Sequence, residues 1–302
     1  MADRLCLRDD PVLGMLVLMV IGLAGFAIWS GLTWQGAAPR HVDVLTARGE
    51  TFEVFGTGAY RLNAEFMALA FRAQDWVMTV VLAMAGWAVL AMRGPRSYAV
   101  LLVALGFVLY GYTTLALAAE LDWLMPVHTA VFSLSMFALW RAGARARDGF
   151  ERMELPRGPL VAYLVFAGLG TAAAWVPPLL SDLSVGPATD FFDTRTSQVG
   201  HVLRLGVILP LCFVAAGLVL RRKALGHVVA LPLLGCLLFL FPSRIVATVF
   251  QWQAGIEFSI PEWAGPIIGF AVIGLMAVLL LRLYLIALRR PPRMPAGDAA
   301  PA

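Results

Sequence analysis

The sequence predicts an all-α fold, a polytopic transmembrane bundle of about eight spans with a small extracytoplasmic β-hairpin-like loop after the first span. Two observations lead to it. Of the 302 residues, 60% are hydrophobic and only 14% are charged, with a mean hydropathy of +0.81, whereas soluble domains carry about 25% charged residues. Long apolar runs also recur along the chain and alternate with short basic loops. A bilayer is the solvent that suits such a chain.

Eight apolar runs are long enough to be considered as membrane spans, because a hydrocarbon core of about 30 Å needs roughly 20 apolar residues per helix. They cover about 11–34, 76–92, 97–119, 125–140, 160–180, 202–220, 227–250 and 261–288. The first run exceeds the apolar core of a signal peptide, so we expect a retained anchor. We predict one membrane domain over 1–290 and a disordered cytoplasmic tail over 291–302, which is rich in Pro and Ala.

Basic residues occupy every second loop, which predicts that these loops, and both termini, are cytoplasmic. They are Arg93 and Arg96, then Arg141, Arg145, Arg147, Arg152 and Arg157, then Arg221, Arg222 and Lys223, then Arg289, Arg290 and Arg293. Lys223 is the only lysine, and Ala and Gly are abundant. This bias indicates a GC-rich bacterial genome, so we expect a bacterial inner (plasma) membrane protein. Basic residues confined to such loops do not indicate nucleic-acid binding.

The loop after the first span predicts a small β-hairpin. Its segment HVDVLTARGETFEVFGTGAY alternates β-branched and polar residues around Arg48-Gly49. An isolated hairpin is marginal in water, so this one should pack on the mouth of the bundle. The following LNAEFMALAFRAQDW is predicted to be helical and places Glu65, Arg72 and Asp75 near one face. That face is either a solvated extension with local ion pairs or the polar wall of an outward-facing cavity.

Ionisable groups inside a membrane are expensive and often functional, and here they lie near the outer ends of the spans. Arg244 is the strongest signal, roughly 10 Å inside its span at 1.5 Å per residue and just after Pro242. It either snorkels or pairs with an acid, or it contacts an anionic ligand. We predict an outward-facing ligand pocket there. Its candidate residues are Arg244, Arg204, Asp75, Glu120, His128, His201, Arg72 and Glu65.

Signatures of metal, cofactor or catalytic chemistry are missing from the sequence. His128, His201, Glu120 and Asp122 are suitable zinc ligands by type, but their spacing matches no ligand motif. The chain has no P-loop and no GxSxG, and its lysine lies in a loop. The four histidines are too scattered for axial haem pairs, and the three cysteines form no CxxC. We therefore expect no metal and no cofactor.

Several motifs resemble a family of bacterial multi-pass membrane proteins that has no assigned activity. They are ARGETFEVFGTGAYR, AQDWV, RG, LGFVLYGY and FSLSMFAL, which lie within 47–139. The second half of the chain shares only the family's hydropathy pattern. The family often has an acidic residue near the start of the sixth span, where this chain has Arg204. The resemblance implies a bundle of about eight spans and implies no function.

These observations leave three functional classes open. The first is a protein that binds or transports a small polar or lipid-like ligand through the outward-facing pocket, with the lipid bilayer as its surroundings. The second is an intramembrane enzyme acting on a lipid or cell-envelope intermediate at the outer leaflet. The third is a non-catalytic accessory subunit. We favour binding or transport, because no catalytic constellation is recognisable, and the sequence does not fix the oligomeric state.

Overall fold

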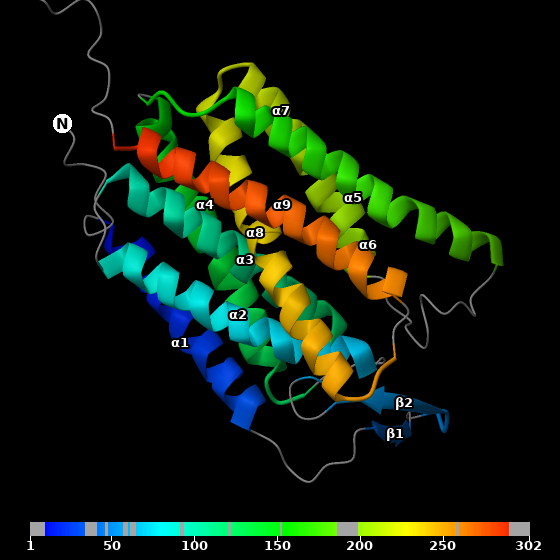
Figure 1. The fold of residues 1–302 in the computed structure, drawn as a ribbon. Helices are drawn as coiled ribbons and strands as arrows, with labels where there is room; N and C mark the ends of the chain where they lie inside the picture. Colours follow the sequence, from blue (N-terminus) through cyan, green and yellow to red (C-terminus); the bar gives the residue numbers. More distant parts are fainter. Residues whose placement is uncertain are drawn as a thin grey trace, which may run out of the picture.

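A computed structural model describes residues 10–33, 41–45, 48–56, 60, 65–90, 94–119, 122–151, 153–185, 199–257 and 260–289. Long helices lie side by side in a bundle, with a two-stranded sheet near one end (Figure 1). The elements are α1 (Pro11–Thr33), β1 (His41–Leu45), β2 (Thr51–Phe55), α2 (Glu65–Leu90), α3 (Pro95–Ala118), α4 (Met125–Glu151), α5 (Gly158–Val185), α6 (Val199–Leu203), the π-helix η4 (Arg204–Ile208), α7 (Leu209–Leu220), α8 (Ala224–Gln253) and α9 (Ile260–Ala287). The predicted all-α fold is confirmed.

Seven helical segments in the described part of the chain are long and apolar enough to cross a membrane, which makes this a multi-pass membrane fold. They are α1, α2, α3, α5, the continuous α6–η4–α7 segment, α8 and α9. The remaining predicted span, 125–140, forms the first half of α4. Its apolar stretch is short because Arg141 and Arg145 follow directly. The helix nevertheless packs along α1 and α3 as part of the bundle.

Several helices extend beyond the predicted spans, because hydropathy marks only the apolar part of a helix. The second helix begins at Glu65, well before Trp76, and the fourth continues from Trp140 to Glu151. In α4 the added turns are rich in Ala and Arg, which are good helix formers. Backbone hydrogen bonding therefore continues into the polar region on either side of the apolar layer.

The π-helix η4 interrupts the sixth predicted span just before Pro210. Pro210 has no N–H, so the Gly206 carbonyl has no i+4 donor, and the proline ring crowds that carbonyl. The Leu209 N–H instead donates to the Arg204 carbonyl, which is the i→i+5 spacing of a π-turn. One extra residue in this turn rotates the side chains before it, including Arg204. Such bulges inside helices are frequent at functional sites.

Helix α3 is the central helix of the bundle and packs against α2, α4 and α8. Within its most apolar window 78% of the residues are buried inside the protein, compared with 22% in α9. The helices α3 and α8 cross with their backbones in contact. A Cβ on Gly106 would meet the backbone of Pro232, and one on Gly235 would meet the carbonyl oxygen of Val103. Glycine at both positions permits this approach.

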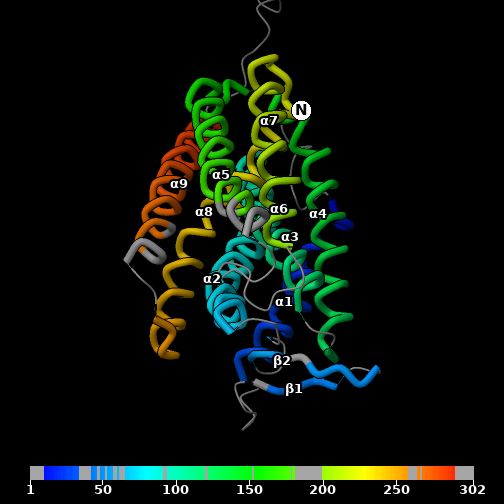
Figure 2. The backbone as a smooth tube through the Cα atoms, turned by 90° about the vertical axis from the view of Figure 1, so that its right-hand side faces the viewer, coloured from blue at the N-terminus to red at the C-terminus, as the bar shows by residue number. Residues whose placement is uncertain are grey.

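The hairpin forms as predicted, at the end of the bundle where α1 ends and α2 begins (Figures 1 and 2). Strands β1 and β2 are antiparallel, and the register pairs His41 with Phe55 and Leu45 with Thr51. Val54 is buried, and β2 packs against α2. The prediction that the hairpin packs on the bundle is therefore confirmed.

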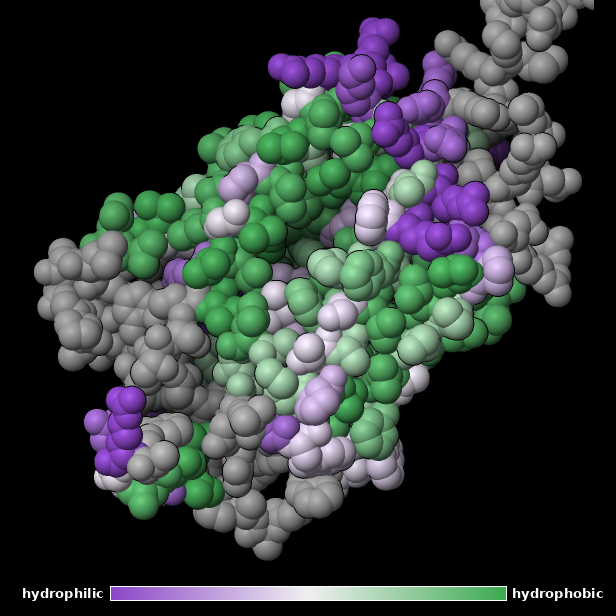
Figure 3. Space-filling model, turned by 180° about the vertical axis from the view of Figure 1, so that it is seen from behind, coloured by the Kyte–Doolittle hydropathy of each residue, from purple (hydrophilic) through white to green (hydrophobic). Residues whose placement is uncertain are grey.

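The opposite end of the bundle, where α1, α3, α5 and α8 begin, is here called the basic end. Its described cations are Arg96, Arg141, Arg145, Arg147, Arg157, Arg221, Arg222, Lys223 and Arg289. Hydrophobic residues cover the sides of the bundle in Figure 3, while strongly hydrophilic residues gather mainly at one end.

Asp10 joins two helices at the basic end. Its carboxylate caps α1 by accepting the Leu13 N–H at 3.1 Å. The same carboxylate accepts hydrogen bonds from Nε of Arg141 at 2.8 Å and Nε of Arg145 at 3.0 Å, both on α4. Asp10 is almost completely buried, with 1% of its side chain exposed. One carboxylate therefore fixes the start of α1 against the basic half of α4.

Candidate functional site

Five of the described candidate residues, together with three aromatic residues, form two groups in the half of the bundle away from the basic end. The first, here called the carboxylate group, comprises Asp75, Tyr60, Tyr112 and His128. The second, here called the arginine pair, comprises Arg204 and Arg244 with Trp175 and His201 beside Arg204. Arg244 lies about 30 Å along α8 from its start at the basic end, at 1.5 Å per residue. Both groups therefore lie away from the arginine-rich loops.

Asp75 is a carboxylate buried on α2, with 4% of the residue exposed. Its Oδ2 accepts a hydrogen bond of 2.6 Å from the Tyr60 hydroxyl, which comes from the segment after the hairpin. Burial, and then the negative charge of Asp75, raise the pKa of the Tyr60 hydroxyl, so this group keeps its proton and donates. The Oδ1 of Asp75 has no hydrogen-bond partner among the described residues.

Tyr112 and His128 connect the carboxylate group to α3 and α4. Tyr112 is close enough to Asp75 for the charge of that carboxylate to act on it, and its hydroxyl donates to the Ala24 carbonyl of α1 at 3.2 Å. The His128 ring lies 5.9 Å from the Tyr112 ring, centroid to centroid. Four elements of the first half of the chain thus contribute to one buried polar group.

Tyr60→Phe should lower the thermal stability of the protein and loosen the hairpin. The change removes the donor to Asp75 without altering the ring that packs beside Gly31. A buried carboxylate that loses its donor is destabilised by about 1–3 kcal/mol. Thermal unfolding in detergent and amide exchange over 41–55 measure the two effects. Asp75→Asn is the control, because asparagine still offers Tyr60 an acceptor. Equal amide exchange of the hairpin in the wild type, Tyr60→Phe and Asp75→Asn would contradict the prediction.

Arg204 begins η4, and the ring of Trp175 orients its side chain. The Arg204 Cζ lies 4.1 Å from the centroid of the Trp175 ring, a cation–π contact. The His201 ring also contacts this ring, edge-on at 5.0 Å between centroids. Stacking uses the face of the guanidinium and leaves its in-plane N–H groups for hydrogen bonds. The Nε of Arg204 is buried and has no acceptor among the described residues.

Arg244 lies in α8 two residues after Pro242 and is half-buried. Its Nε is also buried and lacks an acceptor within the described part of the chain. Arg204 is close enough for its positive charge to act on Arg244, so the two cations lie in the same region. Nearby, Gln251 ties the far end of α8 to α2 by donating to the Phe66 carbonyl at 2.8 Å. The arginine pair is therefore placed by α5, η4 and an α8 that is anchored to α2.

Of the alternatives left open for Arg244, an ion pair with Asp75 is not formed. The Nε of Arg244 and the Oδ1 of Asp75 have no hydrogen-bond partner among the described residues, and Asp75 interacts with Tyr60 instead. Glu120, the other predicted acid, lies outside the described residues. Arg72 is near enough to Tyr60 to act on it electrostatically, and Glu65 is half-buried at the start of α2. The structure thus brings Arg204, His201 and Arg244 to one region, and Asp75, Arg72 and His128 to another.

A metal site receives no structural support from the described residues. Within them, no three His, Cys, Asp or Glu side chains lie close enough to hold an ion. Asp122 accepts the Leu124 N–H at 2.9 Å near the start of α4, and its charge acts on His128. His201 lies in the other group against Trp175. Of the four side chains considered as zinc ligands, His201 thus lies apart from His128 and Asp122, and Glu120 lies outside the described residues.

Three aromatic residues of the two groups were missed as site residues from the sequence. Tyr60 follows a glycine-rich segment, Tyr112 lies within an apolar run, and Trp175 lies near the end of another. Aromatic residues at span ends are ordinarily interfacial anchors, so no signal in the sequence marked Trp175 as the partner of Arg204. Tyr60 could have been found as a buried hydroxyl within the hairpin motif.

Comparison with known proteins gives no match to a family model, to a curated protein or to a solved structure. The arrangement of the carboxylate group and the arginine pair is therefore the basis for any statement of function.

Proposed function

We propose that this protein binds, and as a transporter carries, a small anionic ligand, polar or lipid-like, that is held by Arg204 and Arg244. One observation carries the proposal. Two like-charged guanidinium groups lie near each other in a membrane bundle, and the buried Nε of each lacks an acceptor among the described residues. An anion between them would supply the missing acceptors and reduce their repulsion.

The energetics favour a ligand that bears a carboxylate or phosphate. A cation at the membrane centre costs from about 2.5 kcal/mol upward unless it is paired. Guanidinium groups bind carboxylate and phosphate oxygens with two parallel hydrogen bonds, which gives strength and orientation. Stacking on Trp175 holds the plane of Arg204 in place before the ligand arrives, which lowers the entropy lost on binding. Pro242 has no N–H to donate to the Leu238 carbonyl within α8. This missing hydrogen bond and the π-turn at Arg204 permit local adjustment around the ligand.

The proposed orientation places the basic end in the cytoplasm of a bacterium and the arginine pair toward the outside. The support is the gathering of arginines at one end, as the positive-inside rule requires. Reporter fusions after Arg96, Arg147 and Lys223 should all report cytoplasm. A periplasmic signal at any of these positions would contradict the proposed topology.

Arg244→Lys tests the proposed site. Lysine keeps the charge and loses the planar fork, so the amount of anion that co-purifies with the protein should fall about tenfold or more. Thermal stability in detergent should hold. Extraction of the purified protein followed by mass spectrometry identifies and quantifies the anion. Arg282→Lys is the matched control, because Arg282 is an exposed helical arginine on α9.

The result separates the proposed function from a structural role of the arginines. A structural role predicts lower stability in Arg244→Lys with ligand content unchanged, and that result would overturn the proposal. Turnover of the bound anion into a new product by the purified protein would instead favour the alternative of an intramembrane enzyme.

A further inference from the structure

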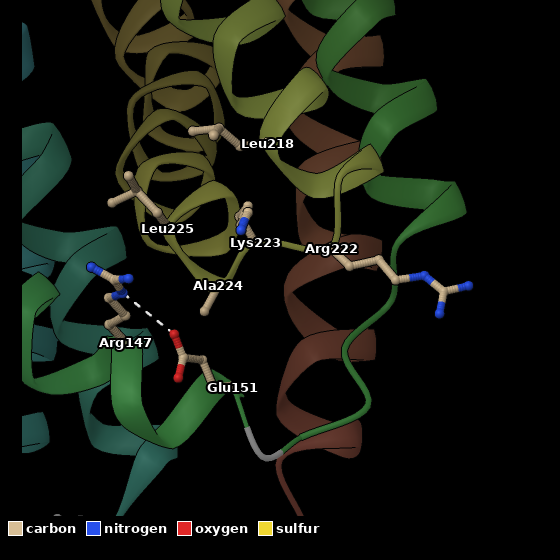
Figure 4. A pocket seen from close by; sticks show the side chains of 7 residues that line it. All are labelled: Arg147, Glu151, Leu218, Arg222, Lys223, Ala224 and Leu225. Atoms are coloured by element: carbon tan, nitrogen blue, oxygen red, sulfur yellow. Dashed lines mark hydrogen bonds and ion pairs between the residues drawn. The ribbon is translucent and has the colours of Figure 1, made fainter.

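A pocket of about 470 Å³ opens at the basic end of the bundle, far from the arginine pair. Figure 4 shows α4 on one side of it and the turn between α7 and α8 on the other. Its lining residues are Arg147, Glu151, Leu218, Arg222, Lys223, Ala224 and Leu225. Small-molecule sites have volumes of about 300–1,000 Å³, so the pocket is large enough for a ligand or a lipid headgroup.

The turn that forms one wall is well defined. Lys223 N–H donates to the Leu218 carbonyl and Arg222 N–H to the Val219 carbonyl, both at 3.0 Å, which is the hydrogen-bond pattern of a Schellman motif. Arg222 occupies the left-handed position with φ of 57°, where glycine is usual. Its side chain points away from Arg147 and Glu151 in Figure 4. Arg147 and Lys223 are therefore the cations on which an anion in the pocket would depend.

The charge balance of the pocket favours an anion. Three cations and one carboxylate line it. The carboxylate of Glu151 accepts from Arg147 Nε at 3.4 Å, and both side chains are more than half exposed. Such an exposed i,i+4 pair contributes roughly 0.3–0.5 kcal/mol, so a ligand displaces it at little cost. The remaining N–H groups of Arg147 stay available to oxygen atoms.

The apolar lining indicates how the ligand would enter. Leu218 and Leu225 belong to the ends of α7 and α8, and Leu225 is exposed. The pocket therefore lies where the apolar sides of the bundle meet its basic end. An amphipathic anion, with a phosphate toward Arg147 and Lys223 and acyl chains along the apolar sides, matches both surfaces.

We propose that this pocket binds a phosphate-bearing anion, which in the membrane is the headgroup of an anionic phospholipid. The proposal is independent of the ligand held by Arg204 and Arg244. The positive-inside rule accounts for cations at this end of the bundle. It does not require two of them to line one pocket together with Leu218 and the exposed Leu225.

Native mass spectrometry of the full chain in detergent tests the proposal, with phosphatidylglycerol, phosphatidylcholine and inorganic phosphate as separate probes. Phosphatidylglycerol should bind to the wild type, and Arg147→Gln with Lys223→Gln should weaken it about tenfold. Arg221→Gln should leave binding unchanged, because Arg221 adjoins the same turn and does not line the pocket. Glu151→Gln should strengthen binding, a gain that misfolding cannot produce.

The probes distinguish the source of the phosphate. Binding of phosphatidylglycerol without inorganic phosphate assigns the site to a lipid, and binding of both assigns it to the phosphate itself. An equal loss in Arg221→Gln and in the double variant would overturn the proposal, since the whole basic face would then be responsible. Equal binding of phosphatidylcholine and phosphatidylglycerol would overturn it as well.

Discussion

Gly235→Ala should lower the thermal unfolding midpoint more than alanine at any other described glycine of the helices. The new Cβ would overlap the Val103 carbonyl oxygen and lie 2.7 Å from the Val103 carbonyl carbon. These are backbone atoms of α3, so no side chain can move aside and the two helices must separate. Overpacking of this kind destabilises by about 1–3 kcal/mol and occasionally more. Thermal unfolding of purified protein in detergent measures it.

A matched variant distinguishes this clash from a general effect of replacing glycine. Gly269→Ala on α9 introduces the same methyl where nothing lies within 4 Å. It should leave stability unchanged or raise it by up to about 1 kcal/mol, because alanine is the better helix former. Gly106→Ala on α3 should lower the unfolding midpoint in the same way, since its Cβ would meet the backbone of Pro232 on α8. Equal midpoints for Gly235→Ala and Gly269→Ala would show that α3 and α8 do not approach this closely.

Asp10→Asn should destabilise the protein by about 1.5–3 kcal/mol, the range of hydrogen bonds to charged groups. Asparagine still caps α1, because its side-chain oxygen accepts the Leu13 N–H as well as a carboxylate does. The ion pairs to Arg141 and Arg145 are lost. Asp10→Ala removes the cap as well and should lower the free energy of unfolding by about another 1 kcal/mol. Arg147→Gln, also on α4, is the control and should have little effect, since the partner of Arg147 among the described residues is the exposed Glu151.

The Asp10 contribution should depend on pH. Burial alone would raise the pKa of this carboxyl, but the Leu13 N–H and the two guanidinium groups outweigh it and hold the pKa below its ordinary value of 3.8. Because the folded pKa is the lower one, the stabilisation is fully present above about pH 4 and is lost as pH falls through the folded value. The stability gap between wild type and Asp10→Asn should therefore close in acid. A gap that stays constant from neutral pH into acid would contradict the assignment.

The sequence predicted the helices and the hairpin because both depend on local patterns. Apolar runs of span length need no knowledge of the partner helix, and the alternation in 41–55 specifies a strand pair by itself. It did not predict that α4 would run on to Glu151 as a packed helix, because Arg141 and Arg145 look like a loop until Asp10 is seen to hold them. Nor did it predict η4, whose cause, Pro210, lies inside an apolar run.

The sequence indicated how deep each candidate residue lies in the bundle and did not indicate which of them meet. Depth follows from position along each span, so Arg204, Arg244, Asp75 and His128 were expected in one half of the bundle, and they lie in the half away from the basic end. Which of them meet depends on how the helices rotate and cross, and that is a property of packing. Asp75 pairs with Tyr60 and Arg204 stacks on Trp175, although nothing in the spacing of these residues links them.

The central place of α3 also determines the order in which the bundle can be completed during synthesis. A ribosome releases α3 into the bilayer long before it has translated α8, which is one of the three helices that pack most extensively against α3. In the interval the face of α3 around Val103 and Gly106 borders acyl chains, which are as apolar as the side chains that later replace them. The early helices therefore remain loosely associated, because replacing lipid contacts with helix contacts gives little hydrophobic free energy. Nascent chains that stop before Gly235 should be recognised by membrane proteases as unfinished, even though most of their spans are already inserted.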